Sequence, residues 1–576
     1  MATKKRKPQK VLTPVPARDI TLQLNWGIPA AAIAAGLVIV FWAYGPSLRG
    51  PFLFDDAYAL PTGRESFLSW THAARPLLMV SYWLNARLSG TDTYPYHLLN
   101  VLFHCVAAGL IFFIVGRLLE WAGAETVRRT GLAGFAAAVF LLHPVQTEAV
   151  AYLAGRSDSL SVMLFLAAYV VFLYRKEVAI SWAASAAVLL LFGAALLSKE
   201  HAIVLPALLL LTDFWWNPGF SVAGIRRNWK IYFLMGAGAV VGVAVLLPVI
   251  LHANNAGFNL KDLTWYQYFF TQCRALFVYP WLFLVPANQS ADWNFPMSKT
   301  IFDHGAIFGL VALLALAGLA WRRRREYRLA SFGFFVYLLL MAPTSSILPI
   351  RDAVAERRLY LSMLGLLLIA VDLLSRLKLT SRALAGACAA IALVFAGVTH
   401  ARAEVWSSEL ALWQDTVQKS PANYRAHFQL ASAYYNLGRC GEAVTEYQKA
   451  GALQTPAYEL LLDWGLAYDC LNQPENALAK MRQAAALENT AHVHTQMGMI
   501  YGKHAQWSEA MDALATAEKL DPNFAPTYVY KGLVHFSQGQ FETAITDYQR
   551  ALVIDPTYQQ ARDGMAQAQA RLMVRH

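Results

Sequence analysis

The sequence predicts an all-α protein in two parts: a bundle of membrane-spanning helices, followed by a solenoid of helix pairs. Hydrophobic residues make up 57% of the 576 residues, which is more apolar surface than a soluble protein of this size needs. The apolar character stops near Val398, and after Ala403 the chain becomes polar and repetitive. We therefore predict a disordered cytoplasmic tail (1–25), a membrane domain (26–402) and a repeat domain (403–576).

The membrane domain is predicted to contain about eleven spans, because short basic clusters separate alternate apolar segments. The first span is longer than the apolar core of a signal peptide, so we expect a retained anchor. The aromatic stretch from Trp265 to Pro286 is expected to be an interfacial or re-entrant segment rather than a span. The predicted spans are 26–46, 97–119, 131–150, 159–175, 180–197, 201–216, 231–253, 303–321, 329–348, 359–375 and 382–400.

The distribution of charge predicts the orientation in the membrane. The net charge of +11 is spread over short clusters such as Arg128-Arg129 and Arg322 to Arg325, between the apolar segments. This is the positive-inside pattern, and it argues against a nucleic-acid-binding surface. An odd number of spans then places the N-terminus in the cytoplasm and the repeat domain outside, as in a multi-pass protein of a bacterial inner membrane.

The repeat domain has a period of about 34 residues, which is typical of tetratricopeptide repeats. The period joins Tyr434 to Tyr468 and Ala443 to Ala477, with Gly465, Gly498 and Gly532 at one small position. We predict four repeats (423–456, 457–490, 491–523 and 525–557), a preceding half repeat and a capping helix. Such an array binds a peptide or protein, or it acts as a spacer or oligomerisation surface.

Cys440 and Cys470 lie in consecutive repeats, near the same end of the first helix in each. An extracytoplasmic domain would permit a disulfide between them. Neighbouring helices of a repeat array stack further apart than a disulfide allows without an offset. The sequence leaves this pairing open.

Two adjacent acids, Asp55 and Asp56, follow the first span in a loop that has no need of them for folding. A carboxylate at a membrane surface, next to apolar helices that exclude water, suits a general base acting on a lipid-linked substrate. The structural alternative is a solvated loop or a helix N-cap.

The remaining unusual polar residues of the membrane domain are all predicted on the same side of the bilayer. A charged side chain near the hydrocarbon core costs free energy. Charged groups at span ends are therefore expected to pair with an opposite charge or to serve a function. The candidates are Arg75, His97, His143, Glu148, Arg156, Asp158, Lys199, Glu200, Glu356, Arg357 and Arg358.

Four stretches resemble the transmembrane and TPR-repeat-containing (TMTC) protein family. They are Phe54-Asp55-Asp56, HPVQTEAVAYLAGRSD (143–158), SKEHAIVLPALLLLTD (198–213) and ERRLYL (356–361). The resemblance covers nearly the whole chain, and the 143–158 stretch is its most specific part. It implies a GT-C glycosyltransferase fold, a polyprenyl-phosphate-mannose donor and O-mannosylation of Ser or Thr on proteins. The animal members are larger and have longer repeat arrays.

We therefore predict a glycosyltransferase in which Asp55, or with less weight Asp56, is the general base of an inverting displacement. The cations Arg357, Arg358, Lys199 and Arg156 are predicted to bind the donor phosphate. The protein acceptor is expected to bind through the repeats. No His, Cys, Asp or Glu spacing is specific for a metal, and a divalent cation bridging Asp56 and the donor phosphate stays open.

Each predicted role has a structural alternative. Arg156 and Asp158 would form an ion pair that closes a turn, or Asp158 would cap a span. Lys199 and Glu200 would pair with each other, His143 would be an interfacial residue without a ligand role, and Arg357 and Arg358 would set topology.

Two other functions are compatible with the sequence. A non-catalytic membrane scaffold would use the spans as an anchor and the repeats as an assembly surface. A related transferase would move a preassembled glycan, or would modify lipid or polysaccharide instead of protein.

Overall fold

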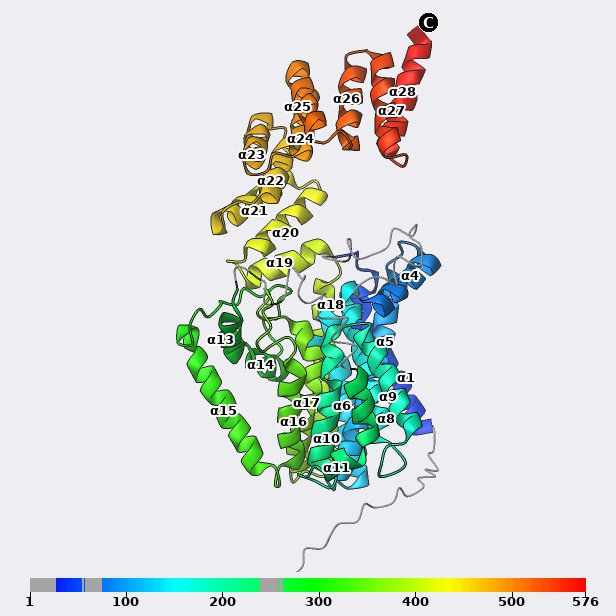
Figure 1. The fold of residues 1–576 in the computed structure, drawn as a ribbon, viewed down its shortest axis with the longest axis vertical. Helices are drawn as coiled ribbons and strands as arrows, with labels where there is room; N and C mark the ends of the chain where they lie inside the picture. Colours follow the sequence, from blue (N-terminus) through cyan, green and yellow to red (C-terminus); the bar gives the residue numbers. More distant parts are fainter. Residues whose placement is uncertain are drawn as a thin grey trace, which may run out of the picture. The chain divides into compact units, whose positions relative to one another are not determined.

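The computed structural model describes residues 27–53, 56, 75–238, 257, 260 and 263–575. All the secondary-structure elements formed by these residues are helices, which confirms the all-α prediction (Figure 1). The chain divides into two compact units, residues 1–412 and 413–576.

The first unit is a helical bundle whose helices follow the predicted apolar segments (Figure 1). Helices α5 and α6 pack together, α5 also packs on α8, and α16 pairs with α17. The helices are α1 (Gly27–Tyr44), α4 (Pro76–Ser89), α5 (Tyr94–Trp121), α6 (Thr126–Leu142), α7 (Thr147–Ala151), α8 (Arg156–Leu173), α9 (Trp182–Leu196), α10 (Leu205–Trp216), α11 (Ala223–Arg227), α13 (Trp265–Ala275), α14 (Val278–Leu284), α15 (Ala306–Arg323), α16 (Arg328–Met341), α17 (Leu359–Ser375) and α18 (Ser381–Val405).

Fewer than eleven helices of the described residues reach the full length of a membrane span. Among the described residues, five helical segments are long and apolar enough to cross a membrane, namely Tyr94–Trp121, Leu153–Leu173, Asp303–Arg323, Glu356–Ser375 and Ser381–Val405. A sixth is the bent pair Thr126–Leu142 and Pro144–Ala151. Other predicted spans correspond to shorter helices such as α9 and α16, and most of 231–253 lies outside the described residues. The chain is thus a multi-pass membrane protein.

The segment Trp265 to Pro286 forms two short helices, α13 and α14, with 11 and 7 residues. Neither is long enough to cross the hydrocarbon core, which needs about 20 residues. The prediction that this stretch does not span as one helix is confirmed. Its breaks fall between Ala275 and Val278, and after Leu284.

Several short helices gather where the long helices end. These are the 3₁₀ turns η1 (Gly45–Arg49), η2 (Pro144–Gln146), η3 (Leu153–Gly155), η4 (Glu200–Val204), η5 (Asp303–Gly305) and η6 (Glu356–Arg358). Four of them, η2, η3, η4 and η6, belong to the polar stretches singled out in the sequence. η2 contacts η6, and η3 contacts α5 and α8, so stretches far apart in the chain meet at one end of the bundle.

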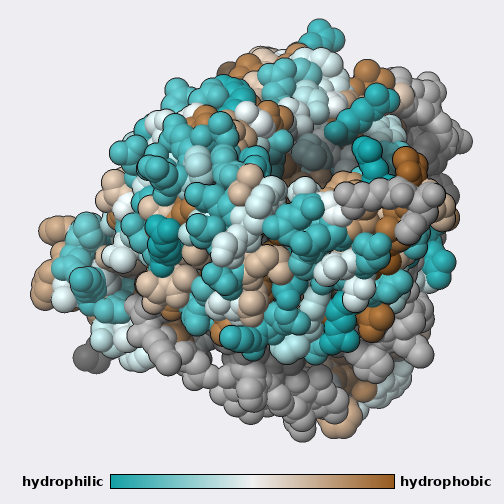
Figure 2. Space-filling model, turned by 90° about the horizontal axis from the view of Figure 1, so that it is seen from above, coloured by the Kyte–Doolittle hydropathy of each residue, from teal (hydrophilic) through white to brown (hydrophobic). Residues whose placement is uncertain are grey.

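The second unit is a series of antiparallel helix pairs, which confirms the four predicted repeats (Figure 1). After α19 (Glu409–Lys419), the pairs are α20 (Tyr424–Asn436) with α21 (Cys440–Leu453), α22 (Tyr458–Cys470) with α23 (Pro474–Leu487), α24 (Ala491–Lys503) with α25 (Trp507–Leu520), and α26 (Ala525–Ser537) with α27 (Phe541–Ile554). The capping helix is α28 (Gln559–Arg575). Figure 2 shows one face of the molecule, on which hydrophilic residues predominate among the coloured residues.

The small position of the repeat is explained by close packing of the two helices in each pair. A Cβ atom on Gly498 would lie 2.6 Å from Leu514 Cγ, and one on Gly532 would lie 2.7 Å from Tyr548 Cε1. Real Cβ atoms do not approach other carbons so closely, so only glycine fits.

Cys440 and Cys470 form a disulfide, with their Cα atoms 6.0 Å apart. Cys440 begins the second helix of one repeat, and Cys470 ends the first helix of the next. The expectation that both lie in first helices was wrong for Cys440. This offset brings the two Cα atoms within the range that a disulfide requires.

Candidate functional site

The polar stretches form a cluster of carboxylates and cations at one end of the bundle. It is built from η2 and α7, the start of α8, η4 and η6, and from Arg75 at the start of α4. We call these side chains the loop cluster: Arg75, Glu148, Asp158, Lys199, Glu200, His201 and Arg357. Its members come from five parts of the sequence, and each carboxylate holds a cation from another part.

Asp158 in the first turn of α8 binds Lys199. The Lys199 ammonium lies 2.6 Å from Asp158 Oδ2 and donates to Ser157 Oγ at 3.2 Å. His201 Nδ1 is 3.8 Å from the other oxygen, Oδ1. Burial lowers the pKa of His201 to about 4, so this histidine is neutral at pH 7. The charge of Asp158 is therefore balanced by Lys199.

Glu200 binds Arg75 through two parallel hydrogen bonds. Arg75 Nε donates to Oε1 at 2.8 Å and Nη2 donates to Oε2 at 2.9 Å. This is the bidentate geometry that fixes a guanidinium in orientation as well as in place. The alternative pairing of Lys199 with Glu200 was wrong, because each has a partner from another part of the cluster.

Glu148 holds Arg357 by both its backbone and its side chain. The Arg357 N–H donates to Glu148 Oε2 at 2.9 Å, and Nη1 donates to Oε1. Nη2 of the same guanidinium lies 3.8 Å from Asp352 Oδ2. The double attachment positions Arg357, in η6 just before α17, next to the start of α7.

In two of the three ion pairs of the loop cluster the cation is more accessible than the acid that holds it, whereas in the third pair Glu200 is more exposed than Arg75. The Arg357 side chain is 36% exposed and that of Lys199 16%, whereas those of Glu148 and Asp158 are 4% and 5% exposed. Burial lowers the pKa of Lys199 and Asp158 raises it, while the positive charges of Arg75 and Arg357 lower it further. Three cations therefore lie within electrostatic reach of one another, which is an arrangement suited to a dianionic phosphate group.

Asp56 is buried, with 2% of its surface exposed. Its Oδ2 accepts from the Leu53 N–H at 2.9 Å, and its Oδ1 accepts from the Ala154 N–H at 2.8 Å. The carboxylate thus joins the loop after η1 to η3, two residues before Arg156. Asp55, the preferred base in the sequence-based prediction, lies outside the described residues.

Arg156 is fully buried between three helices. Its Nε donates to Asn100 Oδ1 at 2.9 Å, Nη1 to Asn85 Oδ1 at 2.7 Å, and Nη2 to the Tyr96 carbonyl at 2.9 Å. Its guanidinium carbon is 4.5 Å from the centre of the Tyr82 ring. The alternative ion pair between Arg156 and Asp158 was wrong, because Arg156 joins α4, α5 and α8 instead.

Glu356 and Arg358 fix the backbone on either side of Arg357. Glu356 is buried and accepts hydrogen bonds from Gln289 Nε2 at 2.7 Å and from the Ser290 N–H at 2.6 Å. Arg358 Nη1 donates to the Ala353 carbonyl at 2.9 Å and to the Tyr268 hydroxyl at 3.2 Å. These two charges therefore attach η6 to the 289–293 segment and to the 352–353 backbone.

The two candidate histidines lie among backbone groups. His143 Nδ1 accepts from the Val145 N–H at 3.2 Å, and its Nε2 donates to the Phe283 carbonyl at 3.0 Å. His97 Nε2 lies 3.2 Å from the Gly50 carbonyl oxygen. Within the described residues, no group of three or more His, Cys, Asp or Glu side chains is arranged to hold a metal ion.

Sequence reasoning missed the residues that support the site from neighbouring helices. Ser81 and Asn85 are four residues apart on α4 and both face Arg156. Their spacing of four residues, which places both on one face of a helix, was the available signal. Gln289 and Ser290 carry no comparable signal, because they lie in an irregular segment whose place is set only by packing.

Family models match parts of the C-terminal unit. Family models described as tetratricopeptide repeat match residues 424–452 and 525–558. The crystal structure of MamA covers 26% of this chain and 86% of its own, with 20% identity and a TM-score of 0.23.

Curated relatives match the membrane domain as well. Protein O-mannosyl-transferase TMTC1 of Homo sapiens is 28% identical over 493 residues, covering 73% of this chain and 54% of its own length. Protein O-mannosyl-transferase TMTC3 of Mus musculus is 24% identical and covers 90% of this chain and 63% of its own. Protein O-mannosyl-transferase Tmtc1 of Drosophila melanogaster is 35% identical over 335 residues, covering 51% of this chain and 38% of its own length.

The chain thus spans between about a third and two thirds of the length of these curated relatives. In this chain the apolar helices come first and the tetratricopeptide repeats follow. This is the order of domains that the resemblance to the TMTC family implies. The chain is therefore a relative of the TMTC proteins, with a membrane domain and tetratricopeptide repeats.

Proposed function

We propose that this protein is a membrane O-mannosyltransferase, which moves mannose from a polyprenyl-phosphate donor to Ser or Thr hydroxyls of proteins. The observation that carries the proposal is the loop cluster, in which buried Glu148 and Asp158 hold the accessible cations Arg357 and Lys199. The relatives bear the name protein O-mannosyl-transferase, which supports this reaction class.

In this proposal, Asp55 is the general base and Asp56 positions the loop that carries it. The base takes the proton from the acceptor hydroxyl, and the hydroxyl oxygen forms a bond to the anomeric carbon. The bond between that carbon and the lipid phosphate oxygen breaks on the opposite side, so the configuration inverts. The lipid phosphate leaves with the electron pair of that bond.

Arg357 and Lys199 bind the departing phosphate, whose charge increases as the bond breaks. Their carboxylate partners keep them in place before the donor arrives, so little reorganisation is needed at the moment of reaction. Arg75 adds positive charge to the same region. Arg156, Glu356 and Arg358 are positioning residues in this scheme, since their polar atoms are directed to the protein itself.

The site is proposed to face the extracytoplasmic side, together with the tetratricopeptide repeats that bind the acceptor protein. The disulfide between Cys440 and Cys470 supports this orientation, because disulfides persist in oxidising compartments. Arg128-Arg129 lies at the opposite end of α6 from His143, and Arg322 to Arg325 lies at the opposite end of α15 from η5, in agreement with the positive-inside rule.

The direct test is glycoproteomics of secreted and membrane proteins, comparing cells that carry the wild-type protein with cells that carry Asp55→Asn/Asp56→Asn. We expect the variant to lose single-hexose increments on Ser and Thr. The control is Asp92→Asn, which changes an exposed acid in the loop before α5. Unchanged glycosylation in the stably expressed double variant would reject the proposal and favour a scaffold or a non-protein acceptor.

A further inference from the structure

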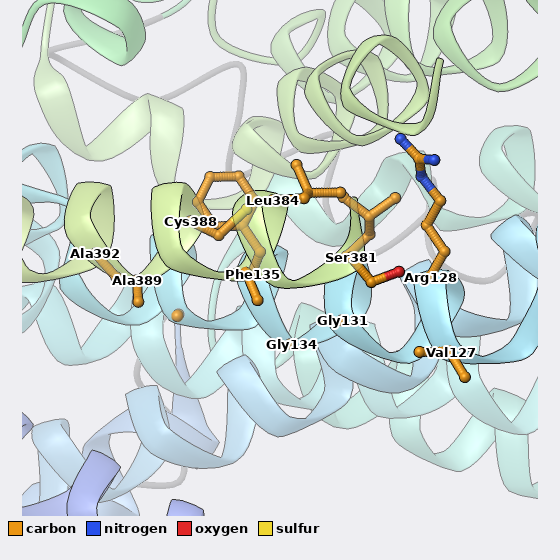
Figure 3. Close-up of a pocket in the computed structure, with 13 residues that line it drawn as sticks. Val127, Arg128, Gly131, Gly134, Phe135, Ser381, Leu384, Cys388, Ala389 and Ala392 are labelled. Atoms are coloured by element: carbon orange, nitrogen blue, oxygen red, sulfur yellow. The ribbon is translucent and has the colours of Figure 1, made fainter. Parts of the chain in front are cut away.

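An apolar groove of about 380 Å³ runs between α6 and α18, at the end of the bundle where both helices begin. Figure 3 shows the two helices side by side, with Val127 and Ser381 at one end and Ala392 at the other. Small residues of both helices form most of the lining, among them Gly131, Gly134, Ala389 and Ala392. Phe135, Leu384 and Cys388 complete the apolar wall.

The length of the groove matches one half of a bilayer. Its lining extends from Val127 to Ala138 on α6 and from Ser381 to Ala392 on α18. At 1.5 Å per residue, each helix contributes about 16 Å to the groove. The hydrocarbon core of a membrane is about 30 Å thick, so one leaflet contributes about 15 Å.

The end of the groove at Val127 and Ser381 carries a cation, Arg128, one of whose donors is buried and unpaired among the described residues. Arg128 Nη2 donates to the Leu374 and Leu377 carbonyls, whereas its Nε has no hydrogen-bond acceptor among the described residues. Ser381 lines the same end, and exposed Lys378 and Arg382 flank it in the sequence. The positive ends of the α6 and α18 dipoles add to this charge.

We propose that this groove binds one acyl chain of an anionic phospholipid, with the lipid phosphate at Arg128 and Ser381. Apolar small residues accept the chain, and the positive end selects an anionic headgroup, which is enriched in the leaflet that faces basic loops. The binding site is separate from the loop cluster, because α6 places Arg128 and His143 at its opposite ends. The inference does not rest on the proposed transferase activity.

Native mass spectrometry of the purified full-length protein tests the proposal by titration with phosphatidylglycerol or phosphatidylcholine of identical acyl chains. We expect phosphatidylglycerol to bind at least tenfold more tightly. Gly131→Leu/Gly134→Leu should weaken that binding at least tenfold by filling the groove. A Cβ atom at either glycine meets no atom within 4 Å, so the backbone tolerates the change.

Two matched controls accompany the titration. Gly386→Leu adds the same side chain to α18 at a glycine that does not line the groove and whose Cβ is also unobstructed. Arg128→Gln should remove the preference for phosphatidylglycerol, whereas Arg129→Gln, next to it and near Glu120, should retain the preference. Equal binding of the two lipids by the wild type, or unchanged binding by the filled variant, would overturn the proposal.

Cys388 gives a second measurement that needs no substitution. It is a free cysteine in the groove wall, and Cys105 is a free cysteine elsewhere in the bundle. Phosphatidylglycerol should slow alkylation of Cys388 by N-ethylmaleimide at least fivefold relative to phosphatidylcholine, and should leave Cys105 unchanged. Equal rates at Cys388 in the two lipids would contradict the proposal.

Discussion

Glu148 and Arg357 are separated by 209 residues in the sequence and are joined twice in the structure, once through the arginine side chain and once through its backbone N–H. Arg357 is therefore held in both position and orientation by an acid that is itself buried. Neutralising Glu148 would remove the negative charge of the carboxylate that accepts both hydrogen bonds.

We expect Glu148→Gln to lower the rate of mannose transfer at least tenfold, because the charge-assisted hydrogen bonds to Arg357 are worth about 1.5–3 kcal/mol. The measurement is transfer from a polyprenyl-phosphate donor by the purified protein. Asp352→Asn is the matched control, because Asp352 lies 3.8 Å from Arg357 and should have a smaller effect. Equal effects of the two substitutions would show that Glu148 has no special role in positioning Arg357.

Lys199→Met should raise the KM for the lipid donor and lower kcat, because Lys199 is proposed to bind the phosphate before and after it leaves. The substitution also leaves Asp158 without its nearest cation, at 2.6 Å. The double variant Lys199→Met/Asp158→Asn removes that uncompensated charge and serves as the control for stability. Recovery of full activity in the double variant would exclude a phosphate-binding role for Lys199.

Arg156→Lys should destabilise the membrane domain by about 3–5 kcal/mol, because lysine cannot reproduce the planar hydrogen bonds to Asn85, Asn100 and Tyr96. The measurement is the thermal unfolding of the detergent-solubilised protein. Arg87→Lys, at an exposed position on α4, is the control. A stable Arg156→Lys variant with only a raised KM for the donor would support the phosphate-binding role predicted from the sequence.

Asp463→Asn should stabilise the repeat domain at pH 8 by about 1–2 kcal/mol. Burial, with a contribution from Glu459, raises the pKa of Asp463 to about 6. A carboxyl whose folded pKa is raised binds its proton more tightly when folded, so its stability contribution is lost as the pH rises from about 4 to 6. The advantage of the variant should therefore grow between pH 4 and 6 and stay constant above.

The unfolding midpoints of the wild type and of Asp463→Asn, measured in the full chain from pH 4 to 8, check this expectation. Glu475→Gln, at the start of α23, is the control for the loss of an acid from the same repeat. A difference between wild type and Asp463→Asn that does not vary with pH would show that Asp463 does not titrate in this range.

Replacing Cys440 and Cys470 by serine should lower the stability of the repeat domain by about 2–4 kcal/mol, as expected for a bridge that closes a loop of 30 residues. The reductant dithiothreitol should lower the unfolding midpoint of the wild type to that of the double serine variant. Its lack of effect on the wild type would show that the cysteines are not bridged in the protein as made.

The sequence by itself determined the helical class, the position of most apolar helices and the repeat units. These features follow from local patterns: apolar runs with basic ends, and small residues with a fixed period. Among the described residues, several predicted spans are shorter helices, because hydropathy does not show where 3₁₀ turns such as η4 shorten a helix.

Only the tertiary structure decided which charges of the site belong together. Arg156 and Asp158 are neighbours in sequence, yet one is buried among α4, α5 and α8 and the other binds Lys199. The disulfide likewise required the offset between Cys440 and Cys470. The physical reason is that ion pairs and bridges depend on the distance between side chains from remote segments, and that distance is set by how the helices pack.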